Sequence, residues 1–289
     1  MIIADILLVL ITFVALLIAS YLDVKNKEVP DWISFGLIAA ALGIRALYAF
    51  NFNDWLYLLY GLAGFGLMFI LGIILFYAKM WGGADSKLLM AFGAVFATKP
   101  SFIKMELSFF GEHLFFLLII LISIAIVGAI YGLGWGIYIY FKNMAKANKE
   151  IKRLFIKKKF MRKIYFILAV SFIFVALIFS SRMLKPITLA LAIIFFVYPY
   201  FYFIIKGIEN VGMVKLISTK KLREGDWIIE NVKIGKKIIC QSSDLGLSKI
   251  QLKELRKLNR QVLIKEGIAF VPAIFLGSFL VIILGILLQ

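Results

Sequence analysis

Two aspartates stand where this sequence could do chemistry. Asp23 follows a long apolar stretch, in SYLDVK, and Asp85 lies in WGGADSK. Two carboxylates a few ångströms apart cannot both ionise readily, so they share a proton. The ionised one can take a proton from a water that attacks a peptide carbonyl, while the protonated one donates to the carbonyl oxygen, and a proton then reaches the leaving amine. If folding brings them together, the pair could hydrolyse a peptide bond.

The residues around Asp85 fit this interpretation. Gly82 and Gly83 give a backbone that an extended peptide can approach closely. Asp85 precedes a helix, whose free N–H groups and dipole favour an ionised carboxylate. Both acids also have an ordinary interpretation, in which Asp23 is the solvated end of a helix and Asp85 is an N-cap.

The composition limits which other chemistry is available. The 289 residues include 33 Lys and Arg against 16 Asp and Glu, a net charge of +17, and 63% are apolar. Such a chain is neither a soluble globular enzyme, nor a disordered tail, nor a disulfide-stapled secreted domain. Its one cysteine, Cys240, and one histidine, His113, exclude Cys-based zinc sites and His clusters and argue against a Ser/His/Asp triad. We therefore expect neither a metal nor an organic cofactor.

Apolar runs predict the elements that must position the two acids. A helix needs about 20 apolar residues to cross a bilayer, and a shorter run, 86–97, also reads as a crossing segment. With that crossing, 28 of the 33 basic residues fall on the cytoplasmic side, as the positive-inside rule favours. The sequence predicts an all-α polytopic protein of the cell (cytoplasmic) membrane with about eight transmembrane helices, both termini outside and both aspartates at the cytoplasmic mouth. The expected spans are 2–22, 33–50, 55–78, 86–97, 113–141, 164–181, 187–206 and 267–288.

Two polar regions interrupt the spans. Residues 142–163 hold ten basic residues and read as a cytoplasmic connector that touches anionic membrane lipid. In the second region, MVKLIS, WIIENVKI and KKIIC predict strands around the turns LREGD and IGKK, and SKIQLKELRKLNRQ predicts an amphipathic helix, so a small cytoplasmic α+β domain is expected. The predicted organisation is a catalytic membrane core at 1–141, the connector at 142–163, two further spans at 164–206, the small domain at 207–266 and a last span at 267–289.

Two motifs resemble those of a known family. The segment DVKNKEVP, residues 23–30, resembles the first motif of the type IV prepilin peptidases, and GGADSK, residues 82–87, resembles their second motif in its relaxed archaeal form. The late FVPA, residues 270–273, is similar to a segment of archaeal homologues. The resemblance covers residues 15–98 well and 265–289 loosely.

The resemblance implies an aspartic endopeptidase with Asp23 and Asp85 as the catalytic pair and Gly82 and Gly83 in support. Lys87, which matches the motif lysine, would hold Asp85 or tune its charge, unless it is only an exposed basic residue. Such peptidases cut the short basic leader from pilin-like or archaellin precursors at the cytoplasmic face, before a hydrophobic helix. Precursor proteins and anionic lipid are then the partners, nucleic acid is not, and the resemblance leaves the oligomeric state open.

Two departures and two alternatives accompany this interpretation. Asp31 stands where bacterial members often have Asn, and the paired CxxC motifs of the bacterial N-terminal domain are missing, so no methyltransferase role is implied. A presenilin-like intramembrane aspartic protease also pairs two aspartates, but it places them deeper in long helices. An ion-coupled secondary transporter would need interrupted inverted repeats and acids near the midplane.

Overall fold

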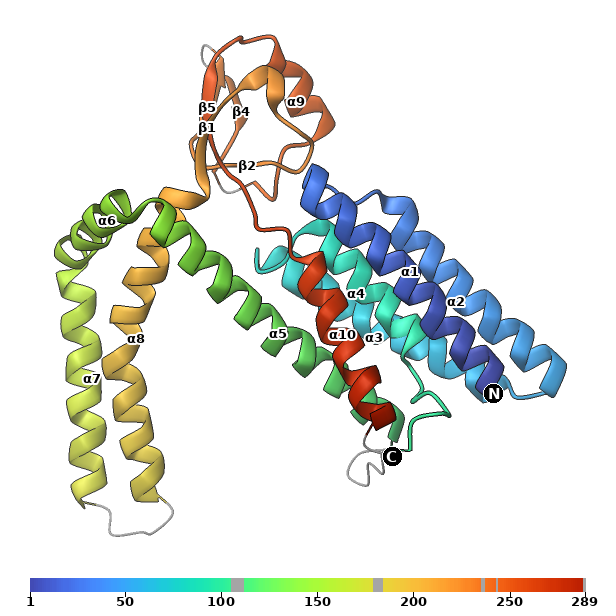
Figure 1. The fold of residues 1–289 in the computed structure, drawn as a ribbon. Helices are drawn as coiled ribbons and strands as arrows, with labels where there is room; N and C mark the ends of the chain where they lie inside the picture. The colour runs from blue at the N-terminus through green and yellow to red at the C-terminus, as the bar shows by residue number, and fades with distance from the viewer. Residues whose placement is uncertain (105–111, 179–183, 235–236, 243, 288–289) are drawn as a thin grey trace.

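The helices of the chain form a main bundle and a separate hairpin (Figure 1). The computed structural model describes residues 1–104, 112–178, 184–234, 237–242 and 244–287. The main bundle consists of α1 (Ile2–Asn26), α2 (Asp31–Phe52), α3 (Trp55–Tyr77), α4 (Gly83–Val95), α5 (Glu112–Lys142) and α10 (Val271–Leu287). The amphipathic helix α6 (Met144–Lys157) leads into the hairpin of α7 (Lys159–Ile178) and α8 (Leu184–Gly212).

Among the residues that the structure describes, six helices are long and apolar enough to cross a membrane: α1, α2, α3, α5, α7 and α8. The runs expected at 86–97 and 267–288 form α4 and α10, which have 13 and 17 residues and fall short of that length. The expected count of about eight spans is therefore not confirmed, although a multi-pass membrane protein is supported. Residues 179–181 and 288, the ends of two expected spans, lie outside the described residues.

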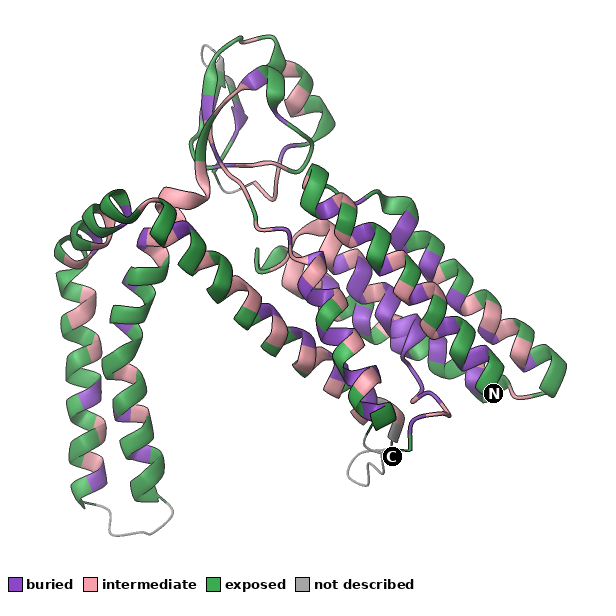
Figure 2. Cartoon of the chain, viewed as in Figure 1, coloured by how far each residue is buried: buried purple, intermediate pink, exposed green. Residues whose placement is uncertain are grey.

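The short helix α4 is the most enclosed of the bundle helices (Figure 2). It packs against α3, α2 and α1, and its apolar side chains, Leu88 and Phe92 among them, are buried. Contact with α3 is close because two glycines meet: a Cβ atom added to Gly64 would lie 2.4 Å from the carbonyl oxygen of Gly93. Glycine at both positions lets the two backbones approach, as is common between membrane helices.

A buried arginine closes the C-terminal end of α4. The last carbonyls of a helix have no partner within it, and Arg45 of α2 donates to two of them, through Nε to Ala94 (2.8 Å) and through Nη2 to Val95 (2.8 Å). The same guanidinium donates to the Tyr57 carbonyl (2.9 Å) and the Thr98 hydroxyl (3.0 Å). Arg45 therefore ties α2, α3 and the end of α4 together inside the bundle.

The small domain confirms the expected sheet-containing region and corrects its details. β5 (Gln261–Lys265) lies between β1 (Val214–Ser218) and β2 (Trp227–Ile228) in an antiparallel sheet, and β3 (Val232–Ile234) pairs with β4 (Lys237–Cys240). The expected amphipathic helix is shorter, as α9 (Lys249–Arg256), and the residue at its expected end, Gln261, instead begins the central strand β5. A separate apolar core, which includes Leu222, Leu255 and Val262, holds the domain together.

The small domain and α6 lie at the end of the molecule where α1 ends (Figure 1). Arg223 of the domain donates to the Asn26 carbonyl at the end of α1 and lies 3.8 Å from Glu28, measured from Nε to Oε1. After α3, Lys79 Nζ donates to the Asp244 carbonyl (3.3 Å). The start of α1 and the end of α10 lie together at the opposite end of the bundle. The five-part division of the chain stays a prediction.

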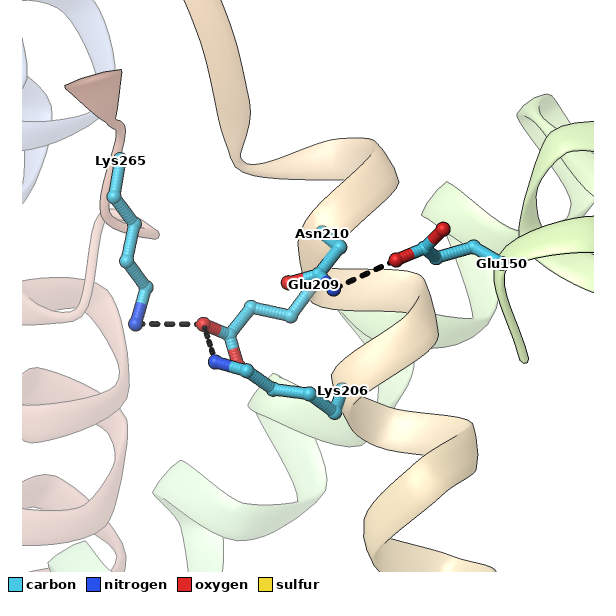
Figure 3. Close-up of polar contacts among 5 residues, drawn as sticks. All are labelled: Glu150, Lys206, Glu209, Asn210 and Lys265. Atoms are coloured by element: carbon cyan, nitrogen blue, oxygen red, sulfur yellow. Dashed lines mark hydrogen bonds and ion pairs between the residues drawn. The ribbon is translucent and has the colours of Figure 1, made fainter. Parts of the chain in front are cut away.

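A carboxylate joins the hairpin to the small domain (Figure 3). Glu209 Oε1 of α8 accepts hydrogen bonds from Lys206 Nζ (2.9 Å) and forms an ion pair with Lys265 Nζ of β5 (2.7 Å). The neighbouring Asn210 donates to Glu150 of α6 (3.0 Å). The connector, the hairpin and the small domain therefore meet at one junction.

The gathering of polar elements at one end yields a test of orientation. In a Cys240→Ala background, Lys149→Cys places a thiol on the exposed face of α6, and Asn51→Cys places one at the opposite end of the bundle. If the basic end is cytoplasmic, an impermeant maleimide applied to intact cells should label position 51 and spare position 149 until the cells are lysed. Labelling of position 149 without lysis would reverse the predicted topology.

The Arg45 contacts yield a test of stability. Arg45→Leu leaves three backbone carbonyls and a threonine hydroxyl without this donor, so we expect the free energy of unfolding to fall by about 3 kcal/mol. Unfolding in mixed micelles of increasing SDS content measures the change. Arg45→Lys keeps a charge but loses the planar set of guanidinium donors. Its free energy of unfolding should lie between those of Arg45→Leu and the unchanged protein. Equal stability of Arg45→Leu and the unchanged protein would contradict this assignment.

Candidate active site

Asp23 sits in the last turn of α1 and faces into the bundle. Its side chain is only 9% exposed, and Oδ2 accepts a hydrogen bond from the backbone N–H of Val271 (3.0 Å). α1 continues for three residues beyond Asp23, to Asn26. Lys27 then closes it in the left-handed conformation, with its N–H donating to the Asp23 carbonyl (2.9 Å). The acid predicted at the end of the first span is therefore buried rather than solvated.

Asp85 sits in the first turn of α4. Gly82 is the N-cap, so Asp85 occupies the third helical position instead of the N-cap position considered from the sequence. Its Oδ2 accepts the N–H of Gly82 (3.2 Å), which satisfies one donor at the helix start. A side chain at Gly82 would crowd this carboxylate, since an added Cβ atom would lie 3.1 Å from Oδ2.

The structure brings the two aspartates to one place. They are close enough for their charges to interact, although 62 positions separate them in the sequence. Tyr131 of α5 lies within the electrostatic reach of Asp23. Phe270 packs against Trp81, with ring centroids 5.6 Å apart, so the start of α10 contacts the segment that carries Asp85 as well. α1, α4, α5 and α10 therefore converge on the pair.

Lys87 has a different partner from the one the resemblance suggested. Its Nζ lies 2.5 Å from Oδ1 of Asp31, the first residue of α2, and 5.7 Å from the centre of the Phe35 ring. This ion pair joins the start of α2 to α4, and Lys87 thus acts on the helix that carries Asp85. Asp31, which stands where bacterial members often have Asn, is therefore the ion-pair partner of this lysine.

Other reactive residues have different surroundings. His113 accepts from the Lys99 N–H (3.3 Å) and packs on Tyr60, at the opposite end of the bundle. Cys240 is buried in the small domain, where burial raises the pKa of its thiol to about 11. Asp226 accepts the Arg223 N–H (2.7 Å) within the predicted turn, and burial raises its pKa. Within the described part of the chain, no group of three His, Cys, Asp or Glu side chains is placed to hold a metal.

Comparison with known proteins confirms the resemblance over the part of the chain that carries the pair. Residues 10–133 match the profile of the type IV leader peptidase family, and this range contains both Asp23 and Asp85. A preflagellin peptidase of Methanococcus voltae is 28% identical over 145 residues, which cover 49% of this chain and 60% of that protein. A preflagellin peptidase of Methanocaldococcus jannaschii is 34% identical over 82 residues, 28% of this chain and 35% of that protein.

These matches are partial on both sides. The matched segments span less than two thirds of either preflagellin peptidase, and the hairpin of α7 and α8 lies beyond the family match. No solved structure matches the chain. The family match runs from residue 10 in α1 through α4 and ends at residue 133, within α5.

Proposed function

We propose that this chain, whose residues 10–133 match the type IV leader peptidase family, is a membrane aspartic endopeptidase. It removes the short basic leader from pilin-like or archaellin precursors at the cytoplasmic membrane face. The observation that carries the proposal is the approach of Asp23 and Asp85 at one end of the bundle, within the matched range. Its similarity to two preflagellin peptidases supports this class of substrate.

The proposed reaction needs only the two carboxylates and a water. One carboxylate is ionised and takes a proton from the water, whose oxygen bonds to the scissile carbonyl carbon. The other is protonated and gives its proton to the carbonyl oxygen. When the C–N bond breaks, the leaving amine takes the proton that came from the water. A proton returns from the intermediate's hydroxyl to the second carboxylate, and both acids regain their starting states.

The position of the acids suits a bond at the membrane face. Asp23 lies three residues before the end of α1, and Asp85 lies in the first turn of α4, at the end of the bundle that faces the small domain. A precursor could keep its hydrophobic helix in the bilayer and present its leader there. The exposed lysines of α6, at the same end, would attract anionic lipid headgroups.

The same positions disfavour the two alternatives. A presenilin-like protease would have both aspartates deep inside long helices, whereas here each is within one turn of a helix end. A transporter would need ionisable groups near the membrane midplane. In the described helices, the buried ionisable group farthest from a helix end is Arg45, and helix carbonyls satisfy it.

Replacing either aspartate tests the catalytic pair. Asp23→Asn and Asp85→Asn keep the size of the side chain but cannot cycle a proton, so each should lower the turnover of a synthetic leader–helix peptide by at least about 100-fold. The double variant should be little worse, because the carboxylates act as one unit. Purified protein and mass determination of the new N-terminus give the readout.

Two acids serve as controls for this experiment. Asp54→Asn alters an acid that also caps a helix, through the Tyr57 N–H (3.4 Å), but at the opposite end of the bundle, and it should keep most activity. Asp31→Asn weakens the Lys87 ion pair and should keep most activity too. Appreciable cleavage by either variant of the pair would defeat the assignment.

The proposed chemistry also predicts independence from metal. With one histidine and one cysteine in 289 residues, the chain has few soft ligands, and two carboxylates suffice to activate water. Cleavage should therefore continue unchanged in EDTA and in the presence of serine and cysteine protease inhibitors. Loss of activity in EDTA that added zinc restores would show that the acids are metal ligands instead.

A further inference from the structure

The first residue of α10 makes a contact that the proposed reaction has not used. The first N–H groups of a helix have no partner within it, and the N–H of Val271 donates to Asp23 Oδ2 over 3.0 Å. Val271 is fully buried and the Asp23 side chain nearly so. Hydrogen bonds from a donor to a charged acceptor are stronger than neutral ones, so the contact favours an ionised Asp23.

Close packing fixes the place of this donor. A Cβ atom added to Gly277 would lie 2.7 Å from Cα of Ile124, so α10 and α5 meet backbone to backbone. Ser123 Oγ of α5 donates to the Gly277 carbonyl (2.8 Å). Phe13 of α1 packs on the other side, with its ring centre 5.3 Å from that of Phe275. The Val271 amide therefore has little freedom to leave Asp23.

Phe270 extends the same contact to the second aspartate. Its ring packs on Trp81, next to the glycines that precede Asp85. On α5 it occupies space that only a glycine leaves open, since a Cβ atom at Gly128 would lie 2.6 Å from Cζ of Phe270. Residues 270 and 271 therefore contact both the segment that carries Asp23 and the segment that carries Asp85.

The charged and titratable groups around Asp23 include both positive and acidic ones. Lys27, which follows α1, and the backbone N–H groups of Val271 and Phe270 at the start of α10 favour its charge. Asp85 of α4 and the Tyr131 hydroxyl of α5 are the titratable groups on which the charge of Asp23 acts. Asp85 also lies at a positive helix end, in the first turn of α4, and accepts the Gly82 amide. The charged side chain that acts on Asp85 is Asp23, whereas Lys27 acts on Asp23. If the pair holds one proton, this arrangement places it on Asp85.

We propose that the N-terminus of α10 is a positioning element of the active site, which holds Asp23 as the ionised carboxylate that activates water and leaves Asp85 as the proton donor. The proposal rests on the proposed function and adds the division of roles. Val271 acts through its backbone N–H, and Phe270 acts through its backbone N–H and through the packing of its ring on Trp81. Asp23 takes the water proton and later gives it to the amine, while Asp85 gives its proton to the carbonyl oxygen and regains it.

Val271→Pro tests the proposal because it deletes the donating N–H. Proline is well tolerated at the first position of a helix, so the helix itself should persist. We expect the acidic limb of the pH profile of kcat/KM to move up by about one pH unit, because the ionised Asp23 loses its donor. Val271→Ala is the matched control, since it removes buried methyl groups but keeps the N–H and should leave the limb in place.

A second pair of variants acts through Phe270. Gly128→Val must displace the Phe270 ring, and it should move the limb in the same direction as Val271→Pro. Gly132→Val lies one helical turn further along α5, where an added Cβ atom has no neighbour within 4 Å. It should leave the acidic limb of the pH profile in place. This pair decides the question if Val271→Pro fails to give a monodisperse protein.

A readout without substrate separates this proposal from the proposed function. A hydrophobic carbodiimide modifies protonated carboxyls, and peptide mass spectrometry can follow its reaction with Asp23 across pH. The midpoint should rise by about one unit in Val271→Pro and not in Val271→Ala. A shifted midpoint in a protein that cleaves no precursor would uphold the α10 contact and refute the peptidase. Unshifted midpoints and pH profiles in both Val271→Pro and Gly128→Val would overturn the α10 proposal alone.

Discussion

The backbone of α4 must be satisfied inside the protein, and the rest of the bundle follows from that constraint. With 13 residues and about 1.5 Å per residue, α4 is roughly 20 Å long, less than the hydrocarbon thickness of a bilayer. Its ends therefore cannot both reach water, and an unpartnered amide in hydrocarbon is costly. Arg45 satisfies the carbonyl end, and the Gly82–Asp85 turn satisfies a donor at the other. α4, which carries Asp85, is thus the helix that the neighbouring helices must surround.

The sequence predicted the parts of the site that depend on local pattern. The two acids, the glycines before Asp85 and the long helices were visible because hydrophobic runs and short motifs carry them. The Val271 donor and the Asp31–Lys87 pair were not, since each joins residues 56 or more positions apart without a shared motif. The one sequence signal for Arg45 was a lone arginine in an apolar run, and it did not indicate which groups the arginine contacts. β5 was missed because its five residues follow directly on a helical pattern.

The hairpin of α7 and α8 makes few contacts with the reactive end of the main bundle. Its residues are largely exposed along both helices (Figure 2), and most of its packing is between the two helices themselves. In a membrane, lipid would cover these surfaces. The hairpin meets the rest of the chain through α6, through the packing of the end of α8 on α5, and through the Glu209 junction with Lys265. The effect of substitutions on its outer face should therefore depend on their contact with lipid and not on the geometry of the two aspartates.

The distance along the chain between Asp23 and its donor has a consequence for biosynthesis. Val271 follows Asp23 by 248 positions. At about 5–20 residues per second, a ribosome adds Val271 roughly 10–50 s after Asp23. During that interval the nascent protein already holds Asp85 and the glycines beside it, yet the amide that fixes Asp23 does not exist. The order of the helices in the chain thus sets how long Asp23 lacks its donor. During that time the nascent protein lies in the membrane with an incomplete site.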